Sequence, residues 1–532
     1  MRILKLAAQV VFYLAILALL VSSSVSAGIS HDENQFIAPG QLLAYHGLFP
    51  YVDYPYTHMP YGAAPYAVSA WASDHDFLAG RLMSCLAWLA SILLMVAIAR
   101  ALRAGTGTAG REPPSWLRLL WEFLLVYVFV NHPLMLFILS TALNHSLATL
   151  FSLLAAWFLV QGILEPSRSY RAAFQSGVFI AIAGLTRFNY ASLGLVLFAA
   201  WLIYARGLRL AHPGKVLGRY LGGGLVASLP AMVLAVLAPQ AFYYGNLVYI
   251  RLNTVYYQGL LRKSGMDLVT KFAEFVSFTA ARPLDMLLYA VLLYTAGAAL
   301  LQMWRQKSRL EPGRLGIAAI AVALWLTAFT PTPALLQYFA APLPFIFLLL
   351  AAFEVNLGRF QRWGQAIGSL ALLVAALTGI RLRNPMNDLM VLSDPSTWPP
   401  VQLHEFAVSL REHVVGGRIL TLQPMIPMEA GYEVYPFTSN APFSWRTSLL
   451  LTAQRRLEYG VTSPEELRAV LRQTPPDAIL VGFEAPHAGF ERQELGGLET
   501  PFSDYAREHG YEPVALTTPF WTRGFTLWVN RP

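Results

Sequence analysis

Long apolar runs recur through the first 380 residues, and they limit what this chain can fold into more than any other feature. A helix needs about 20 apolar residues to cross the hydrocarbon core of a bilayer. Only 13% of the residues are charged, whereas a soluble domain has roughly a quarter, so a water-soluble globule is excluded. The sequence therefore predicts a multi-span α-helical membrane protein with about eleven spans, at 6–27, 78–99, 117–137, 146–164, 173–187, 189–205, 220–238, 284–304, 315–331, 333–353 and 364–381.

The loops between these spans divide into a basic and an acidic set. The basic set contains 18 Lys and Arg residues and four acids. The opposite loop, 28–77, contains five acids and no Lys or Arg. Because Lys and Arg are enriched in cytoplasmic loops, we expect the N-terminus in the cytoplasm and the C-terminal tail outside it, with the protein in the inner (plasma) membrane. The basic set comprises the N-terminus and the loops 100–118, 165–172, 205–219, 305–314 and 354–363.

The first span, 6–27, also has features of a signal peptide, with Arg2 and Lys5 before it and Val25-Ser26-Ala27 as a cleavage site. Its length favours an uncleaved span. In both cases residue 28 emerges on the outer side.

The tail, residues 382–532, is less apolar than the preceding spans and has the pattern of a small α/β domain. We therefore predict a transmembrane part, 1–381, followed by a soluble extracytoplasmic domain, 382–532. Ser463 and Glu466 form the capping-box pattern at the start of one tail helix. The expected strands are 418–422, 478–483, 512–517 and 525–530, and the expected helices are 403–414, 464–472 and 501–508.

Several familiar motifs do not fit their surroundings. Gly105-Thr-Gly107-Thr-Ala-Gly110 matches a dinucleotide fingerprint, but it lies between two spans rather than between a strand and a helix. A basic face with interleaved aromatic residues is absent from the sequence, so nucleic acid is not an expected partner. Cys85 is the only cysteine, which excludes an intrachain disulfide and a cysteine-based metal site. The scattered histidines signal no metal site, although a site built across loops stays open.

The informative segment is the first external loop, 28–77, in which Asp32 and Glu33 follow the first span by about five residues. A partly desolvated carboxylate at the membrane surface can have a raised pKa and act as a general base. Asp32 with Gln35 also fits an N-cap and its capping-box partner, at the start of a helix over 33–46. Asp53 lies in a Pro- and Tyr-rich turn, where an acid commonly accepts local backbone hydrogen bonds.

This loop resembles the GT-C glycosyltransferases that use lipid-linked sugars. The resemblance rests on the Asp-Glu pair, on Gly47-Leu-Phe-Pro50-Tyr51-Val-Asp53 and on His58-Met-Pro60-Tyr61. It is specific over about 28–62 and extends over 1–380 as architecture. The similar proteins are bacterial protein O-mannosyltransferases, aminoarabinose transferases of lipid A and galacturonic-acid transferases of lipopolysaccharide.

The resemblance implies an inverting hexosyl- or pentosyltransferase that moves a sugar from polyprenyl phosphate to an extracytoplasmic glycan, lipid or protein. Asp32 takes the place of the catalytic acid that accepts the acceptor's proton, and Glu33 that of the second acid. Asp53 and His58 are further candidates for substrate binding. A cofactor is not required by the pattern, although a divalent cation stays open.

A phosphate leaving group needs cations or hydrogen-bond donors around it. Arg187, between the fifth and sixth predicted spans, is one candidate, with an interfacial arginine that reaches lipid headgroups as the alternative. The loop 239–283 supplies others, Arg251, Arg262 and Lys263 among them. Salt bridges to the acidic loop, or contacts to headgroups, are the alternatives for these residues.

Other functions stay open at this point. A transporter or flippase of lipid-linked glycans would need charged residues near the membrane midplane, and Glu122 is the only acid well inside a predicted span. A non-catalytic subunit of cell-envelope assembly would not depend on Asp32 for sugar transfer. An O-antigen polymerase or ligase would carry its large loop late in the order of spans.

Overall fold

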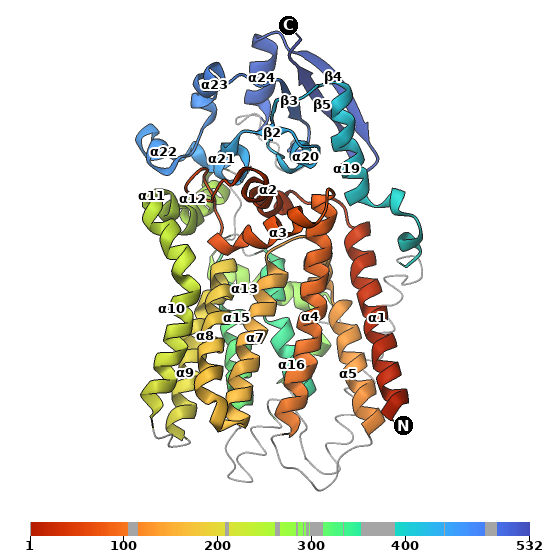
Figure 1. Ribbon diagram of the computed structural model, residues 1–532, viewed down its shortest axis with the longest axis vertical. Coiled ribbons are helices and arrows are strands. Elements are labelled where there is room, and N and C mark those ends of the chain that lie inside the picture. The colour runs from red at the N-terminus through yellow and green to blue at the C-terminus, as the bar shows by residue number, and fades with distance from the viewer. Residues whose placement is uncertain are drawn as a thin grey trace.

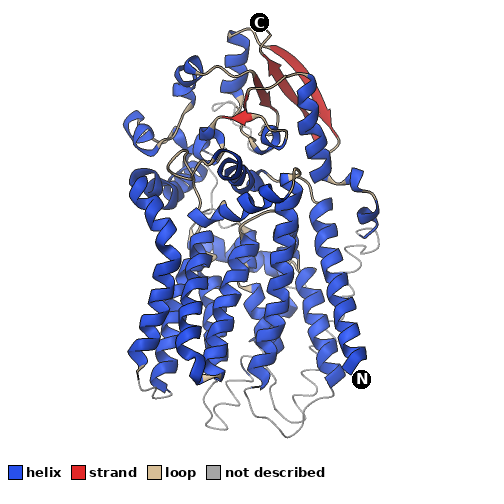
Figure 2. Ribbon diagram, in the orientation of Figure 1, coloured by secondary structure: helices blue, strands red, loops and turns tan. Residues whose placement is uncertain are grey.

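The architecture is a bundle of long helices with a smaller, sheet-containing part on one end of it (Figures 1 and 2). The N-terminus lies at the far end of the bundle, and the C-terminus lies beyond the sheet (Figure 1). This computed structural model describes residues 2–104, 115–207, 212–260, 267–282, 286–290, 292–293, 297, 312–332, 335–352, 389–440, 442–484 and 497–531.

Within the described residues, five helices are long and apolar enough to cross a membrane, and a bent helix pair raises the number to six. The predicted spans 284–304 and 364–381 lie largely or wholly outside the described residues, so the expected eleven are not reached. The five are α1 (Arg2–Ser26), α4 (Asp76–Ala104), α7 (His145–Leu164), α9 (Leu193–Gly207, with the preceding turn) and α10 (Pro213–Leu237). Shorter bundle helices are α8 (Ser169–Thr186), α15 (Pro312–Thr327) and α16 (Leu343–Ala352).

The predicted span 117–137 is not one helix. It is divided into α5 (Ser115–Val130) and α6 (Pro133–Ser140), which meet at an angle of 72°. Pro133 has no amide hydrogen to continue the helix, and the His132 ring accepts a hydrogen bond from the Leu134 N–H at 3.2 Å. The ring thereby caps the second helix and fixes the bend.

Two glycines allow α8 and α10 to pack with their backbones in contact. A Cβ atom at Gly177 would lie 1.9 Å from the Tyr220 carbonyl oxygen, and one at Gly223 would lie 2.0 Å from the Phe174 carbonyl oxygen. Larger residues at either position would therefore force the two helices apart.

Those residues of the basic set that the structure describes lie at the end of the bundle opposite the sheet. There, Arg100 and Arg103 at the end of α4 pair with Glu122 of α5, and the Arg100–Glu122 distance is 2.6 Å. Glu122, the acid predicted inside a span, is thus neutralised by two arginines. The sheet lies at the other end, beside the loop that has no Lys or Arg (Figure 1).

Short helices lie between the bundle and the sheet (Figure 1). From the first external loop come α2 (His31–His46), the 3-10 turn Pro60–Gly62 and α3 (Ala64–Ala72). The segment after α10 is helical rather than a loop. It forms α11 (Pro239–Tyr243), α12 (Tyr249–Val255) and α13 (Leu268–Ala280), with π-helical turns at Tyr244–Val248 and Tyr256–Leu260.

The C-terminal part contains a five-stranded mixed sheet of order β2-β1-β3-β5-β4. Strand β1 pairs in parallel with β2 and β3, with Ile419 opposite Ala478, whereas β5 pairs antiparallel with β3 and β4. Every expected strand is present. Strand β2 was not predicted, because it is only two residues long. The strands are β1 (Arg418–Leu420), β2 (Glu433–Val434), β3 (Ala478–Val481), β4 (Glu512–Thr518) and β5 (Trp521–Val529).

The three helices expected in this part are present, although the first begins four residues earlier than predicted, and three further helices among the described residues were not expected. Glu466 accepts a hydrogen bond from the Ser463 N–H at 3.1 Å, as the capping-box pattern requires. The helices are α19 (Pro399–Ser409), α20 (Met425–Glu429), α21 (Phe443–Ser448), α22 (Ala453–Tyr459), α23 (Pro464–Gln473) and α24 (Thr500–Glu508).

Buried polar contacts join the C-terminal part to the first external loop. The Asn34 side-chain oxygen accepts from the Met425 N–H at 3.1 Å, and the Asn440 amide donates to the Thr57 hydroxyl at 2.6 Å. A polar group buried without its partner costs free energy, so these bonds fix how the two parts dock.

Candidate functional site

The first turn of α2 positions the two acids of the predicted pair differently. Ser30, not Asp32, is the N-cap, and Glu33 accepts a hydrogen bond from the Ser30 N–H at 3.1 Å. The predicted cap at Asp32 with Gln35 as its partner is therefore wrong by two residues. Ser30 with Glu33 has the same spacing as Asp32 with Gln35, and burial of Glu33 decides between them.

Glu33 is fully buried in an ion pair with Arg81 of α4. Both carboxylate oxygens accept from the guanidinium, at 2.8 and 2.7 Å, and Oε1 also accepts from the Ala142 N–H at 2.7 Å. A carboxylate with both oxygens engaged in this way has no site left for a substrate proton. This geometry favours a positioning role for Glu33, and a catalytic role for it stays a prediction.

Asp32 is part-exposed, with 22% of its side chain accessible. Its Oδ1 lies 3.2 Å from His31 Nε2 and accepts from the Gln35 amide at 3.2 Å. No donor to Oδ2 is found in the part of the chain that the structure describes. Burial raises the pKa of Asp32, but the His31 hydrogen bond and the charges of His31 and Arg446 lower it more, so the net pKa lies below its usual value. The raised pKa expected from the sequence is therefore wrong.

Gln35 connects Asp32 to His58. A carboxylate can only accept hydrogen bonds, so the Gln35 nitrogen must face Asp32 and its oxygen must face His58. His58 Nε2 then carries the hydrogen. Burial and the charge of Arg187 lower the pKa of His58 to about 3, so its ring is neutral. His58 reaches the site through Gln35 rather than by direct contact with Asp32.

Arg187 lies half-buried at the C-terminal end of α8. Its Nη1 donates to the Asn144 side-chain oxygen at 2.7 Å, and its guanidinium lies 5.6 Å from the centre of the Tyr338 ring. Nε is buried with no hydrogen-bond partner. Among the described residues no carboxylate pairs with it, so this cation is turned into the protein and not to lipid headgroups.

Arg446 of α21, in the C-terminal part, is a second buried arginine that sequence analysis missed. Its Nη2 donates to the Asn253 side chain at 2.7 Å, and its guanidinium lies over Phe443, Tyr256 and Tyr257 at 4.6–5.3 Å from their ring centres. Within the described ranges it has no ion pair with an acid, and its Nε has no partner. Aromatic rings and amides hold this charge without neutralising it.

These side chains converge on one place. Asp32 lies close enough for its charge to act on Arg187, on Arg446 and on Tyr338. His31 supplies the physical link, because its ring packs 5.7 Å from that of Phe443, over which Arg446 lies. Asp32, Arg187 and Arg446 thus lie near one another, although their segments are far apart in the sequence.

Other residues predicted for the site lie elsewhere. Asp53 is exposed and accepts a hydrogen bond from the Phe49 N–H at 2.6 Å, which is the turn role that the sequence left open. Arg251 is exposed on α12, and no hydrogen bond or ion pair joins it to the cluster in the described ranges. Arg262 and Lys263 lie outside the described residues.

A cavity of about 430 Å³ opens beside the start of α2. It lies between the end of α1, α6 and a stacked pair of rings, Phe483 and Trp521, whose centres are 4.4 Å apart. His31 lines this cavity and bonds Asp32, so the cavity leads to the neighbourhood of the carboxylate. Its other lining residues are Ala27, Gly28, Ile29, Ser30, Phe137, Ser140 and Thr141.

The ion pair of Glu33 and Arg81 makes a testable prediction about folding. Glu33→Gln leaves the Arg81 charge buried and unpaired, which costs about 3–5 kcal/mol of folding free energy. The matched control is Glu165→Gln, which breaks an exposed pair with Arg168 and costs at most about 1 kcal/mol. Thermal unfolding of both variants in detergent tests this, and equal stabilities would contradict it.

Comparison with known proteins supports the architecture. Neither a scan against protein-family models nor a search of curated proteins finds a match. The crystal structure of ArnT from Cupriavidus metallidurans bound to undecaprenyl phosphate aligns with a TM-score of 0.56 and 12% identity, over 98% of each chain. The apo structure of ArnT gives 0.52 and 13%, over 99% of this chain and 97% of the other. This multi-pass membrane protein has the fold of the GT-C glycosyltransferases, which confirms the resemblance seen in its first external loop.

Proposed function

We propose that this protein is an inverting glycosyltransferase that moves a sugar from a polyprenyl-phosphate carrier to a hydroxyl-bearing acceptor. The observation that carries the proposal is the cluster of Asp32, Arg187 and Arg446, in which a carboxylate lies near one half-buried and one buried arginine that have no acid partner among the described residues. Such an arrangement matches a reaction that removes a proton at one point and releases a phosphate at another.

The two arginines are suited to the phosphate of the donor. A phosphate ester gains negative charge as its bond to the sugar breaks, and buried guanidinium groups stabilise that charge. Arg187 and Arg446 each retain a buried Nε–H without a partner. A lipid phosphate is also found in the similar ArnT structure, which is bound to undecaprenyl phosphate.

Asp32 is suited to act as the general base. Its lowered pKa keeps it ionised, and His31 and Gln35 hold Oδ1 so that Oδ2 is directed to a substrate. The acceptor hydroxyl gives its proton to Asp32 as its oxygen bonds to the anomeric carbon. The bond from that carbon to the phosphate oxygen breaks in the same step, and the carrier phosphate leaves with the electron pair. A single displacement of this kind inverts the anomeric configuration.

The charge pattern favours the extracytoplasmic face of the inner membrane as the side on which this reaction would take place. The basic ends of the bundle helices lie opposite the sheet, and the site lies between bundle and sheet. Nucleotide sugars are cytoplasmic donors, so a lipid carrier is the activated sugar suited to this face. Because the oxygens of Glu33 are taken by Arg81, the Asp32–Glu33 pair does not offer two carboxylates to a divalent cation.

A transporter is less well supported. The one acid predicted inside a span, Glu122, is held in an ion pair with Arg100 and Arg103 at the basic end of the bundle. An acid neutralised in this way serves packing rather than the passage of an ion.

Asp32→Asn tests the proposal directly. Loss of the general base should lower the rate of sugar transfer roughly a hundred- to ten-thousand-fold, while donor binding is kept. The matched control is Asp53→Asn, which changes the exposed turn acid of the same loop. Transfer from a radiolabelled polyprenyl-phosphate sugar to membrane acceptors measures both. Parent-like transfer by Asp32→Asn would refute the base assignment.

The arginines make a separate prediction about the donor. Arg187→Gln removes one charge-assisted contact and should raise the KM for the lipid-linked donor roughly ten- to a hundredfold, with the KM for the acceptor unchanged. Arg251→Gln, which changes an exposed arginine outside the cluster, should alter neither. Initial rates at varied donor and varied acceptor separate the two constants. An effect on the acceptor alone would count against a phosphate site.

The environment of Asp32 predicts how activity depends on pH. A base works only above its pKa, so the lowered pKa of Asp32 places the acid limb of kcat/KM below the range of an ordinary carboxyl. His31→Ala removes the hydrogen bond that lowers this pKa, so the acid limb should move to higher pH. A pH–rate profile of parent and variant measures the shift, and a limb that stays in place or moves down contradicts the assignment.

A further inference from the structure

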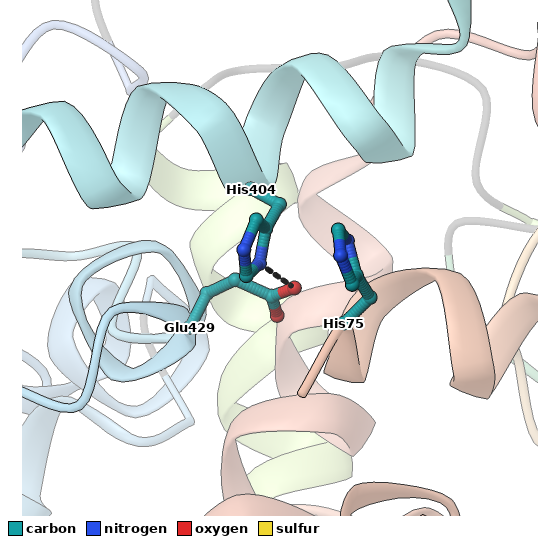
Figure 3. Close-up of side chains that lie close together, drawn as sticks. All are labelled: His75, His404 and Glu429. Atoms are coloured by element: carbon teal, nitrogen blue, oxygen red, sulfur yellow. Dashed lines mark hydrogen bonds and ion pairs between the residues drawn. The ribbon is translucent and has the colours of Figure 1, made fainter. Parts of the chain in front are cut away.

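A second cluster of ligand-type side chains lies on the other side of the docked C-terminal part. His75 precedes α4, His404 lies on α19 and Glu429 ends α20, and Figure 3 shows the three side chains facing one another. One donor atom from each lies within 4.8 Å of the other two. The rings of His75 and His404 are stacked 3.8 Å apart, and His404 Nδ1 lies 3.1 Å from Glu429 Oε1.

The surroundings hold Glu429 in a fixed orientation. Its side chain is fully buried, and its Oε2 accepts a hydrogen bond from the Phe77 N–H at 3.1 Å, which leaves Oε1 directed to the histidines. His75 Nδ1 is buried with no hydrogen-bond partner. A buried carboxylate and a buried imidazole nitrogen without a partner are both costly unless something binds them.

We propose that His75, His404 and Glu429 bind a divalent transition-metal ion of the zinc type. Two imidazole nitrogens and one carboxylate oxygen suit zinc, whereas magnesium and calcium favour oxygen ligands. Zinc bonds of about 2.0–2.2 Å put tetrahedral ligands about 3.5 Å apart, so the cluster needs to tighten by roughly an ångström. An imidazole binds an ion in its ring plane, so the two histidine rings also need to turn out of their stacked arrangement. A water molecule supplies the fourth ligand.

Space for that water is present. A cavity of about 480 Å³ is lined by His404 and Glu429 together with Asp74 and Asp76. Both oxygens of Asp76 already accept hydrogen bonds, from Gln41 and from Tyr45, at 2.7 Å each. Asp76 therefore lines the cavity and supports the segment that carries His75, but it is not a ligand of the ion.

The ion would join the C-terminal part to the first external loop. His404 and Glu429 come from the C-terminal part, and His75 comes from the segment that Gln41 and Tyr45 of α2 hold through Asp76. None of the three ligands belongs to the cluster of Asp32, Arg187 and Arg446. A metal ion at this site would thus hold the C-terminal part to the first external loop. The site does not depend on the proposed sugar transfer.

Metal content of the purified full-length protein tests this. After treatment with a chelator and addition of Zn²⁺, the parent should retain roughly one ion per chain on gel filtration, and its thermal unfolding temperature should rise. His404→Ala should lose that ion, with Kd weakened more than the ten- to hundredfold seen when a residue behind a ligand is changed. The matched control is His413→Ala, a histidine nearby in sequence but outside the cluster, and it should bind as the parent does.

His75→Ala provides an independent check, because it leaves the C-terminal part unchanged and removes the ligand that lies across the joint. It should weaken zinc binding and abolish the zinc-dependent rise in unfolding temperature. Replacing Zn²⁺ by Co²⁺ in the parent should give visible absorption bands that both alanine variants lack. The proposal is overturned if the parent retains no ion, or if His75→Ala and His404→Ala retain as much as His413→Ala.

Discussion

The rest of this structure depends on the buried ion pair between Arg81 and Glu33. The Arg81 guanidinium donates to both Glu33 oxygens and to the carbonyl oxygens of Ser24, Ala27 and Gly28, at 2.6–2.8 Å. A buried pair is tolerated only when its remaining hydrogen-bonding groups are satisfied, and here they are. The pair thereby fixes the end of α1 and the start of α2 to α4.

This constraint also sets the direction of the next acid along the chain. Successive residues of a helix point about 100° apart, so a buried Glu33 turns Asp32 away from Arg81. Asp32 then meets His31 and Gln35, and through them the charges of Arg187 and Arg446. Two adjacent carboxylates are thus divided between two tasks. Both oxygens of Glu33 are engaged in hydrogen bonds that hold the fold. Asp32 keeps Oδ2 without a donor among the described residues.

Local patterns in the sequence predicted much of this arrangement. Apolar runs located the long helices, the loop without Lys or Arg indicated the side on which the tail lies, and strand-like runs located the strands of the C-terminal part. What local patterns missed are pairings between distant segments. The Ser30–Glu33 box has the sequence signature of a capping box, but the choice between it and Asp32–Gln35 depends on Arg81, which buries Glu33. Arg446 is surrounded in sequence by ordinary tail residues, and its partners lie some 190 residues earlier. His75 and His404 have no shared spacing, because folding alone brings them together.

The C-terminal part is therefore a component of the site rather than an appendage. It supplies Arg446 directly, and it supplies Phe443, which packs against His31. Its contacts with the first external loop are polar and buried, at Asn34 and at Asn440 among others. Polar contacts of this kind are specific in geometry, because each misplaced donor or acceptor is left unsatisfied. Because Arg446 is positioned through this joint, the accuracy of docking sets the distance between Arg446 and Asp32.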